Sequence, residues 1–65
     1  MKIYLNGEIT ITNSQNLLAL IQELSLDGKR YAVELNEMIV SKSKLQDTPL
    51  SDSDQIEIIH AVGGG

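Results

Sequence analysis

The dipeptide Asn6-Gly7 lies between two short runs in which apolar and polar residues alternate, and it predicts that the chain begins with a β-hairpin. Asn and Gly both tolerate the positive φ angles of a two-residue hairpin turn, so this pair is the strongest short-range hairpin signal. Side chains along a strand point to opposite faces in turn, so the alternation indicates one buried and one exposed face. We expect the apolar residues of both strands to share the buried face: Ile3, Leu5, Ile9 and Ile11.

A stripe of leucine and isoleucine follows the hairpin and predicts one amphipathic helix. Its apolar residues recur at helical spacing and comprise Leu17, Leu18, Leu20, Ile21 and Leu24. This spacing places them on one side of a helix, where they would pack on a sheet. The polar residues Asn16, Gln22 and Glu23 are expected on the solvent side.

The residues on either side of the stripe indicate where the helix begins and ends. Thr12, Asn13 and Ser14 are all of the types that cap helix N-termini, and Asn13 is the favoured cap. At the other end, Asp27-Gly28 closes the segment, and Gly28 can take the left-handed conformation that follows many helices.

Three further strands are predicted in the second half of the chain. Residues 31–35 and 38–40 flank a turn at Asn36-Glu37, and the last strand alternates from residue 55 to 62. The stretch before the last strand is polar and irregular. Within it, Leu45 is expected to fill a gap in the core from a single helical turn.

The order of these elements predicts a two-layer α+β domain, with one main helix on one face of a mixed sheet of four to five strands. The long connection from Ser41 to the last strand rules out a simple hairpin there. We therefore expect the last strand to return beside the first one, in parallel. This topology is the ubiquitin-like β-grasp, with a domain at residues 1–62 and a tail at residues 63–65.

Composition restricts the function classes. A chain of 65 residues forms one small domain with a small core. The absence of cysteine excludes disulfides and thiolate metal sites. The net charge of -4 argues against nucleic acid and anionic membranes as partners, and it favours a partner with a basic face. No stretch has the length of a signal peptide or a membrane span, so a soluble intracellular protein is expected.

Few residues are candidates for catalysis or metal binding. His60 is the only histidine and has no nucleophile at a readable spacing, so no triad is indicated and a surface role is expected. Asp52 and Asp54 lack a third ligand and are interpreted as turn formers. Lys42 and Lys44 are expected to be solvated. We predict no catalytic residue, no metal site and no bound cofactor.

The triplet Gly63-Gly64-Gly65 closes the sequence and is the strongest functional signal. Glycine has no Cβ, so such a tail is thin and can be threaded into a narrow active site of another protein. The three residues reach roughly 10 Å. The terminal carboxylate is a poor electrophile, so a partner would first convert it to an acyl-adenylate, which implies ATP at the partner's site. A sulfur nucleophile would then give a thiocarboxylate, and an amine would give an isopeptide. A linker remnant or a disordered end is the structural alternative.

A docking surface for such a partner is expected at the root of the tail. Ile59 is predicted to point away from the face that holds Ile56 and Ile58. With its neighbours it would form a small apolar partner interface, made of Tyr4, Ile59, Ala61 and Val62.

Four stretches of this sequence together resemble one known family. They are the opening MKIYLNG, the pair Leu17-Leu18, residues 33–40, and the run from Leu50 to Gly65. These stretches are similar to the ThiS-type sulfur carriers of thiamine biosynthesis, and the resemblance covers the whole chain. One departure is Ser53, which stands where the family often has glycine.

The resemblance implies a β-grasp fold and a set of partners. Gly65 would be adenylated by an E1-like, ThiF-type adenylyltransferase and converted to a thiocarboxylate with sulfur from a donor such as a cysteine desulfurase. The thiocarboxylate would supply sulfur to a ThiG-type thiazole synthase, and the tail Gly63–Gly65 would enter those active sites. The implied location is the bacterial cytoplasm or the plastid stroma. Three alternatives stay open: a carrier for molybdopterin or another sulfur-containing product, a ubiquitin-like protein modifier, and a plain interaction module.

Overall fold

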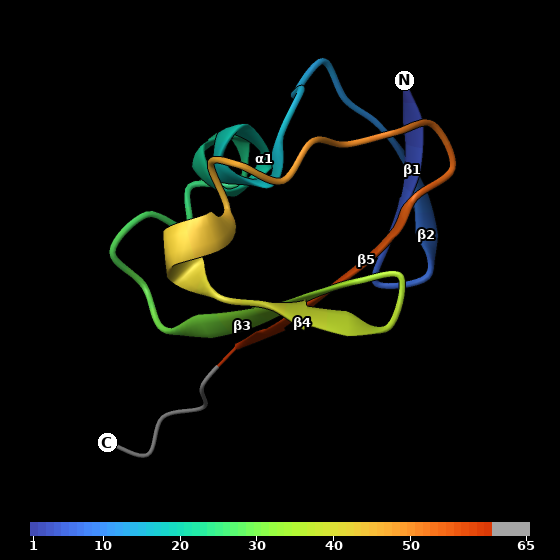
Figure 1. Ribbon diagram of the computed structural model, residues 1–65. Coiled ribbons are helices and arrows are strands. Elements are labelled where there is room, and N and C mark those ends of the chain that lie inside the picture. Colours follow the sequence, from blue (N-terminus) through green and yellow to red (C-terminus); the bar gives the residue numbers. More distant parts are fainter. Residues whose placement is uncertain (61–65) are drawn as a thin grey trace.

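The computed structural model describes residues 1–60 and shows a five-stranded mixed sheet with one α-helix. The predicted boundary between domain and tail lies outside the described residues. The elements in chain order are β1 (Lys2–Leu5), β2 (Glu8–Ile11), α1 (Leu17–Glu23), β3 (Tyr31–Leu35), β4 (Met38–Val40), the 3-10 turn η1 (Lys42–Lys44) and β5 (Gln55–His60). The strand order is β2-β1-β5-β3-β4. β5 runs parallel to β1 and antiparallel to β3, which confirms the predicted β-grasp topology (Figure 1).

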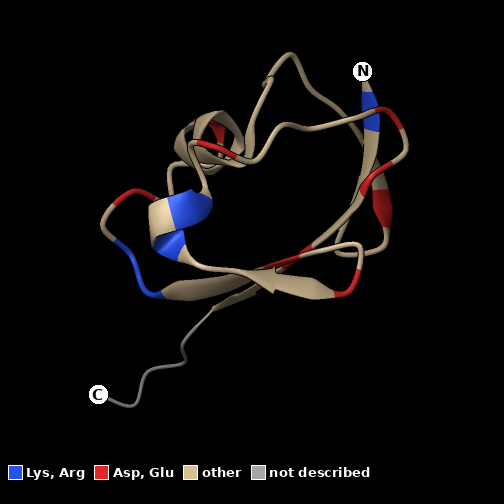
Figure 2. Cartoon of the chain, viewed as in Figure 1, with Lys and Arg blue, Asp and Glu red and all other residues tan. Residues whose placement is uncertain are grey.

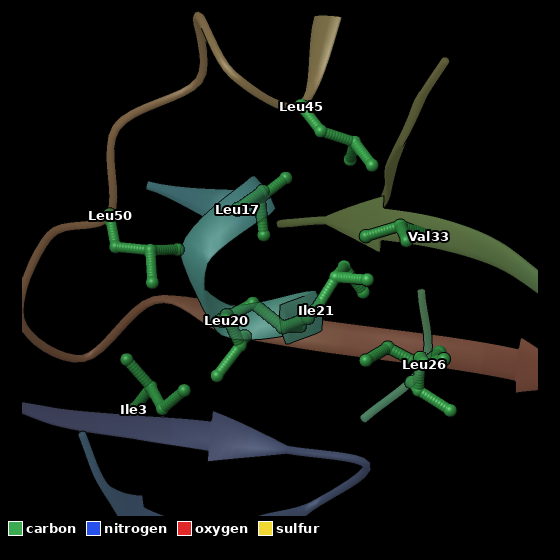
Figure 3. Packing of buried hydrophobic residues seen from close by; sticks show 10 residues of the cluster. Ile3, Leu17, Leu20, Ile21, Leu26, Val33, Leu45 and Leu50 are labelled. Atoms are coloured by element: carbon green, nitrogen blue, oxygen red, sulfur yellow. The ribbon is translucent and has the colours of Figure 1, made fainter. Parts of the chain in front are cut away.

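The core is a single layer between α1 and one face of the sheet (Figure 3). The apolar stripe of the helix supplies its centre, and the inward residues of β1, β3 and β5 complete it. Leu45 is 2% exposed directly after η1, so the predicted filling of a core gap from one helical turn is confirmed. The buried apolar residues are Ile3, Leu17, Leu20, Ile21, Leu26, Val33, Leu45, Leu50, Ile56 and Ile58.

The hairpin forms as predicted, but its apolar residues do not share one face. Leu5 pairs with Glu8 across the two-residue turn, so Tyr4, not Leu5, lies opposite Ile9. Directly opposite residues point to the same side of a sheet, which places Ile9 and Ile11 on the face away from the core. Their side chains are 65% and 71% exposed. The prediction that Ile9 and Ile11 are buried is therefore wrong.

The helix begins at a different cap from the one predicted. Asn16 has an extended backbone, and its Oδ1 accepts the N–H of Ala19 at 2.8 Å. Asn16 is therefore the N-cap, not Asn13, and it is not a residue of the helix's solvent face. This cap lies directly before the apolar stripe, so every turn of α1 contributes to the core.

The helix also ends without Gly28. Ser25 takes the left-handed conformation with φ 60°, and the N–H of Leu26 donates to the carbonyl of Ile21 at 3.0 Å. Together with the bond from Ser25 N–H to the Gln22 carbonyl, this is a Schellman motif. Gly28 does have a positive φ of 76°, but in the turn that follows.

Two buried hydroxyls connect the end of α1 to the segment after β2. Thr12 Oγ1 and Ser14 Oγ both donate to Glu23 Oε1, at 2.6 Å and 2.7 Å. These hydrogen bonds favour the ionised form, so they hold the pKa of Glu23 below its ordinary value of 4.5. Thr12 and Ser14 were N-cap candidates, and this contact explains why neither caps the helix.

Candidate functional site

The C-terminal segment continues from β5, which occupies the centre of the sheet. β5 pairs with β1 at Gln55 and Ile56, and with β3 from Ile56 to its last residue, His60. β5 is therefore paired on both sides near its start and with β3 alone in the ladder at His60. The predicted site residues Ala61, Val62, Gly63, Gly64 and Gly65 follow His60 and lie outside the described residues.

Two turn asparagines hold β5 from opposite sides. Asn6 Oδ1 accepts the N–H of Ile58 at 2.8 Å, and Asn36 Oδ1 accepts the N–H of Gln55 at 2.9 Å. Both asparagines have a φ of 50° in the tight turns of the two hairpins. The backbone N–H of Asn6 also donates to the carbonyl of Ile56. Asn6 thus continues the ladder beyond the end of β1.

Sequence reasoning used these asparagines only as turn residues and missed their contacts with β5. A usable signal was present, because both two-residue turns begin with Asn and its amide can bond to a neighbouring strand.

The face of the sheet that α1 does not cover, here called the open face, carries the predicted docking residue. Ile59 points away from Ile56 and Ile58, as predicted, and its side chain is 52% exposed. Its neighbour across the ladder is Ala32. Tyr4 shares the open face but lies opposite Gln55, four residues before Ile59 and about 13 Å away along β5. The structure therefore pairs Ile59 with Ala32 and not with Tyr4.

Two carboxylates lie next to Ile59 on the open face. Glu57 of β5 and Glu34 of β3 are directly opposite each other in the ladder. Like charges in this position destabilise a sheet. Together with Glu37 they line a shallow depression near the start of β5, at the end of the strand away from His60.

The opposite charge gathers where β5 ends. Four of the five cationic residues lie there: Lys29 and Arg30 before β3, and Lys42 and Lys44 in η1 (Figure 2). Lys42 and Lys44 are exposed, as predicted, and the Nζ of Lys42 also lies 4.4 Å from the centroid of the Tyr31 ring. The same Nζ donates to the backbone carbonyl of Lys29 at 3.2 Å. We call these four residues the cationic end.

His60 lies opposite Tyr31 and is exposed, in agreement with a surface role. A shallow groove of about 400 Å³ lies beside it, and its described lining consists of Arg30, Tyr31, Ala32, Lys42, Ile59 and His60. The groove therefore combines cations with apolar surface at the root of the C-terminal segment.

The two aspartates before β5 form a turn, as predicted. Asp52 Oδ1 accepts the N–H of Lys2 at 2.9 Å, and Asp54 Oδ2 accepts the N–H of Ser51 at 2.8 Å. The bond from Lys2 holds the pKa of Asp52 below its ordinary value of 3.8. Between them, Ser53 has a φ of 71°, the conformation that favours glycine.

Within residues 1–60, no group of three or more His, Asp or Glu residues is placed to hold a metal ion. Over the same residues, no helix has the length and apolar character needed to cross a bilayer.

Comparisons with known proteins agree with this geometry. The sequence pattern of the ThiS family matches residues 2–65. The thiazole synthase of Paramagnetospirillum magneticum is 39% identical over 66 residues, which cover 100% of this chain and 20% of that protein. The chain thus spans about a fifth of that relative's length. The sulfur carrier protein ThiS of Bacillus subtilis is 45% identical over 51 residues, 78% of this chain and 73% of that protein.

A solved structure has the same fold. The crystal structure of the thiamine biosynthesis protein ThiS from Geobacter metallireducens matches with a TM-score of 0.84 and 25% identity, over 100% of both chains. The match to the family's sequence pattern includes the residues that follow His60.

Proposed function

The chain belongs to the ThiS family, and on this premise we propose that it carries sulfur as a thiocarboxylate on Gly65 for the thiazole ring of thiamine. The observation that supports the proposal most strongly is the family match over residues 2–65, which includes the whole glycine tail. A relative named sulfur carrier protein ThiS, 45% identical to this chain, supports it further.

The proposed chemistry takes place on the carboxylate of Gly65, in the active sites of partners. An oxygen of this carboxylate attacks the α-phosphorus of ATP, and pyrophosphate leaves, which gives an acyl-adenylate. A hydrosulfide then attacks the acyl carbon, the bond to AMP breaks, and a thiocarboxylate remains. We assign activation to a ThiF-type adenylyltransferase and the sulfur supply to a donor such as a cysteine desulfurase, whose persulfide sulfur is released as hydrosulfide by a thiol reductant. The chain itself is a co-substrate of these enzymes, with ATP bound by the adenylyltransferase.

We further propose a ThiG-type thiazole synthase as the acceptor. A protein named thiazole synthase contains a segment that is 39% identical to this entire chain, which supports a joint role for the two parts. The proposed setting is the bacterial cytoplasm or the plastid stroma.

The structure supports this role through the position of β5. Its backbone is bonded on both sides, and the side chains of Asn6 and Asn36 add two further bonds. A firmly held strand gives the tail a defined starting point, so docking of the domain would direct Gly65 toward the partner's reacting groups. Pre-ordering of this kind lowers the entropic cost of binding.

The intact mass of the protein tests the first step. The protein is incubated with the adenylyltransferase, ATP and sodium sulfide, and its mass is measured. We expect a gain equal to the exchange of one oxygen for one sulfur, and no gain without ATP. A variant that lacks Gly65 is the matched control and should keep its melting temperature while losing the mass gain. An unchanged mass with an adenylyltransferase that modifies another carrier would overturn the proposal.

The second step separates thiazole synthesis from the other sulfur products. The purified thiocarboxylate form is mixed with thiazole synthase and its substrates, and in parallel with molybdopterin synthase. Loss of sulfur only in the first mixture is expected. Loss only in the second would assign the chain to the other carrier class, and a ladder of protein conjugates in cells would indicate a modifier.

A further inference from the structure

We propose that the cationic end docks on an acidic surface of the activating adenylyltransferase, at the rim of the channel that takes up the tail. This inference rests on the proposed function, because it names the surface through which that partner would recognise the chain. It differs from the expectation drawn from net charge, which favoured a partner with a basic face.

The first observation is the separation of charge along the molecule. The chain has a net charge of -4, yet four of its five cations lie where β5 ends. The fifth, Lys2, lies in β1 with its Nζ 5.4 Å from the Tyr4 ring. Glu34, Glu37 and Glu57 line a depression toward the other end of β5. Figure 2 shows the lysine and arginine colour on η1 and on the segment that enters β3. Asp27 and Asp47 lie close to these cations in the sequence, so the cationic end keeps an excess of positive charge although the molecule as a whole is acidic.

The second observation is that one of these cations is held in place. Lys42 contacts the Tyr31 ring and donates to the Lys29 carbonyl, which limits the freedom of its side chain. A lysine that is already ordered loses less entropy when a carboxylate binds it. The groove beside Lys42 has no carboxylate in its described lining, so an incoming acidic side chain meets no repulsion there.

The third observation is the apolar surface in the same groove. Ile59 is 52% exposed, lies opposite Ala32 and lines the same groove as Arg30 and Lys42. An apolar centre with a charged rim is the usual composition of a protein–protein interface, and complementary charge at the rim sets orientation and association rate. The combination fits an acidic protein surface that also offers an apolar side chain.

The spacing between His60 and Gly65, the residue proposed to react, indicates what the cations contact. Gly65 lies five residues after His60, and an extended chain of that length spans at most roughly 17 Å. A tail threaded through a narrow channel is extended, so the cationic end would lie at the channel entrance, away from the reacting phosphate of ATP. The contact is therefore with the partner's protein surface.

Association rates with the adenylyltransferase test this surface. Arg30→Gln and Lys44→Gln each remove one exposed positive charge from the cationic end, and neither side chain forms a hydrogen bond with another of residues 1–60. Lys2→Gln is the matched control, because it changes the net charge equally but lies in β1. We expect each cluster variant to lower the association rate about threefold at low salt, with little change for Lys2→Gln. The difference should vanish near 1 M salt, where screening acts within ~3 Å.

Two outcomes would overturn the inference: equal effects of Arg30→Gln and Lys2→Gln, or cluster effects that do not depend on salt. Melting curves of each variant exclude a folding defect. Binding does not require the chemical step, so the rate series decides the docking surface separately from the mass experiment. If binding follows the prediction while the mass never changes, the proposed function fails and the docking surface stands. If the mass changes while the rates of all variants agree, only the docking surface fails.

Discussion

The hydrogen bond between Asn6 and Ile58 gives a prediction that can be worked out in magnitude. Asn6→Gly removes the side-chain acceptor while keeping the turn, because glycine takes a φ of 50° without strain. The N–H of Ile58 then loses its partner in a partly buried place. An unsatisfied donor of this kind costs about 1–3 kcal/mol, and the higher backbone entropy of glycine in the unfolded chain adds about 0.5 kcal/mol. We expect a loss of about 1–2 kcal/mol, since Ile58 N–H lies near enough to the surface for partial solvation.

Thermal unfolding followed by circular dichroism measures this loss. In a domain of this size, 1 kcal/mol corresponds to about 4–8 °C in melting temperature, so a loss of about 1–2 kcal/mol corresponds to a drop of roughly 4–16 °C. Hydrogen exchange adds a local test, because the Ile58 amide should lose protection more than the amides of β3.

Asn6→Asp is the matched control, since it keeps an acceptor oxygen at the same place and tolerates a positive φ. It should be more stable than Asn6→Gly. The reasoning would be refuted if Asn6→Gly unfolded within about 0.5 kcal/mol of the parent protein, or if Asp and Gly behaved alike.

Three other changes have defined expected results. Glu37→Gly should raise the free energy of unfolding by about 0.5–1 kcal/mol in urea titrations, because Glu37 has a φ of 73° where glycine is unstrained; a loss of stability would contradict this. Glu23→Ala should destabilise the fold by about 1 kcal/mol, because it leaves the Thr12 and Ser14 hydroxyls without their acceptor. The pKa of Glu23 is lowered in the folded state, so its contribution is present above pH 4.5 and is lost as the pH falls through the folded pKa. As the pH falls from neutral to below the folded pKa of Glu23, the free energy of unfolding should therefore drop less for Glu23→Ala than for the parent protein. Parallel curves of this free energy against pH would show that the two hydrogen bonds to Glu23 contribute nothing. Ile59→Asp should weaken binding to the adenylyltransferase without unfolding, because Ile59 is 52% exposed; a collapsed melting temperature would place it in the core.

The spacing of apolar residues was sufficient to predict the strands, the helix and most of the core. Alternation indicated the strands, and recurrence at helical spacing indicated the helix. Alternation could not assign Ile9 and Ile11 to a face. Alternation fixes which residues of one strand share a side, but the pairing across the turn fixes how two strands match. Leu5 pairs with Glu8, and that single register reverses the assignment for β2.

The helix cap was missed for a tertiary reason. Thr12, Asn13 and Ser14 are all competent caps, and propensity alone does not separate them from Asn16. Thr12 and Ser14 bond to the carboxylate of Glu23, a contact that exists only once the helix has docked.

The candidate site was predictable only where it depended on the pattern within one strand. The outward direction of Ile59 followed from its phase relative to Ile56 and Ile58, and the structure confirms it. The position of Tyr4 depended on the register between two parallel strands that are far apart in the sequence. The sequence did not predict the cationic end, because Lys29 and Lys42 come together only through the packing of η1 beside β3.

The facing carboxylates of Glu34 and Glu57 also bear on how copies of the protein meet one another. The open face carries several exposed isoleucines: Ile9, Ile11, Ile39 and Ile59. Two copies of a protein with such a face would tend to associate through it at high concentration. Two copies stacked in this way would press the carboxylates of both against each other, and like charges in a dry contact cost several kcal/mol. The charge pair that destabilises a single sheet would thus also disfavour stacking of two copies through the open face.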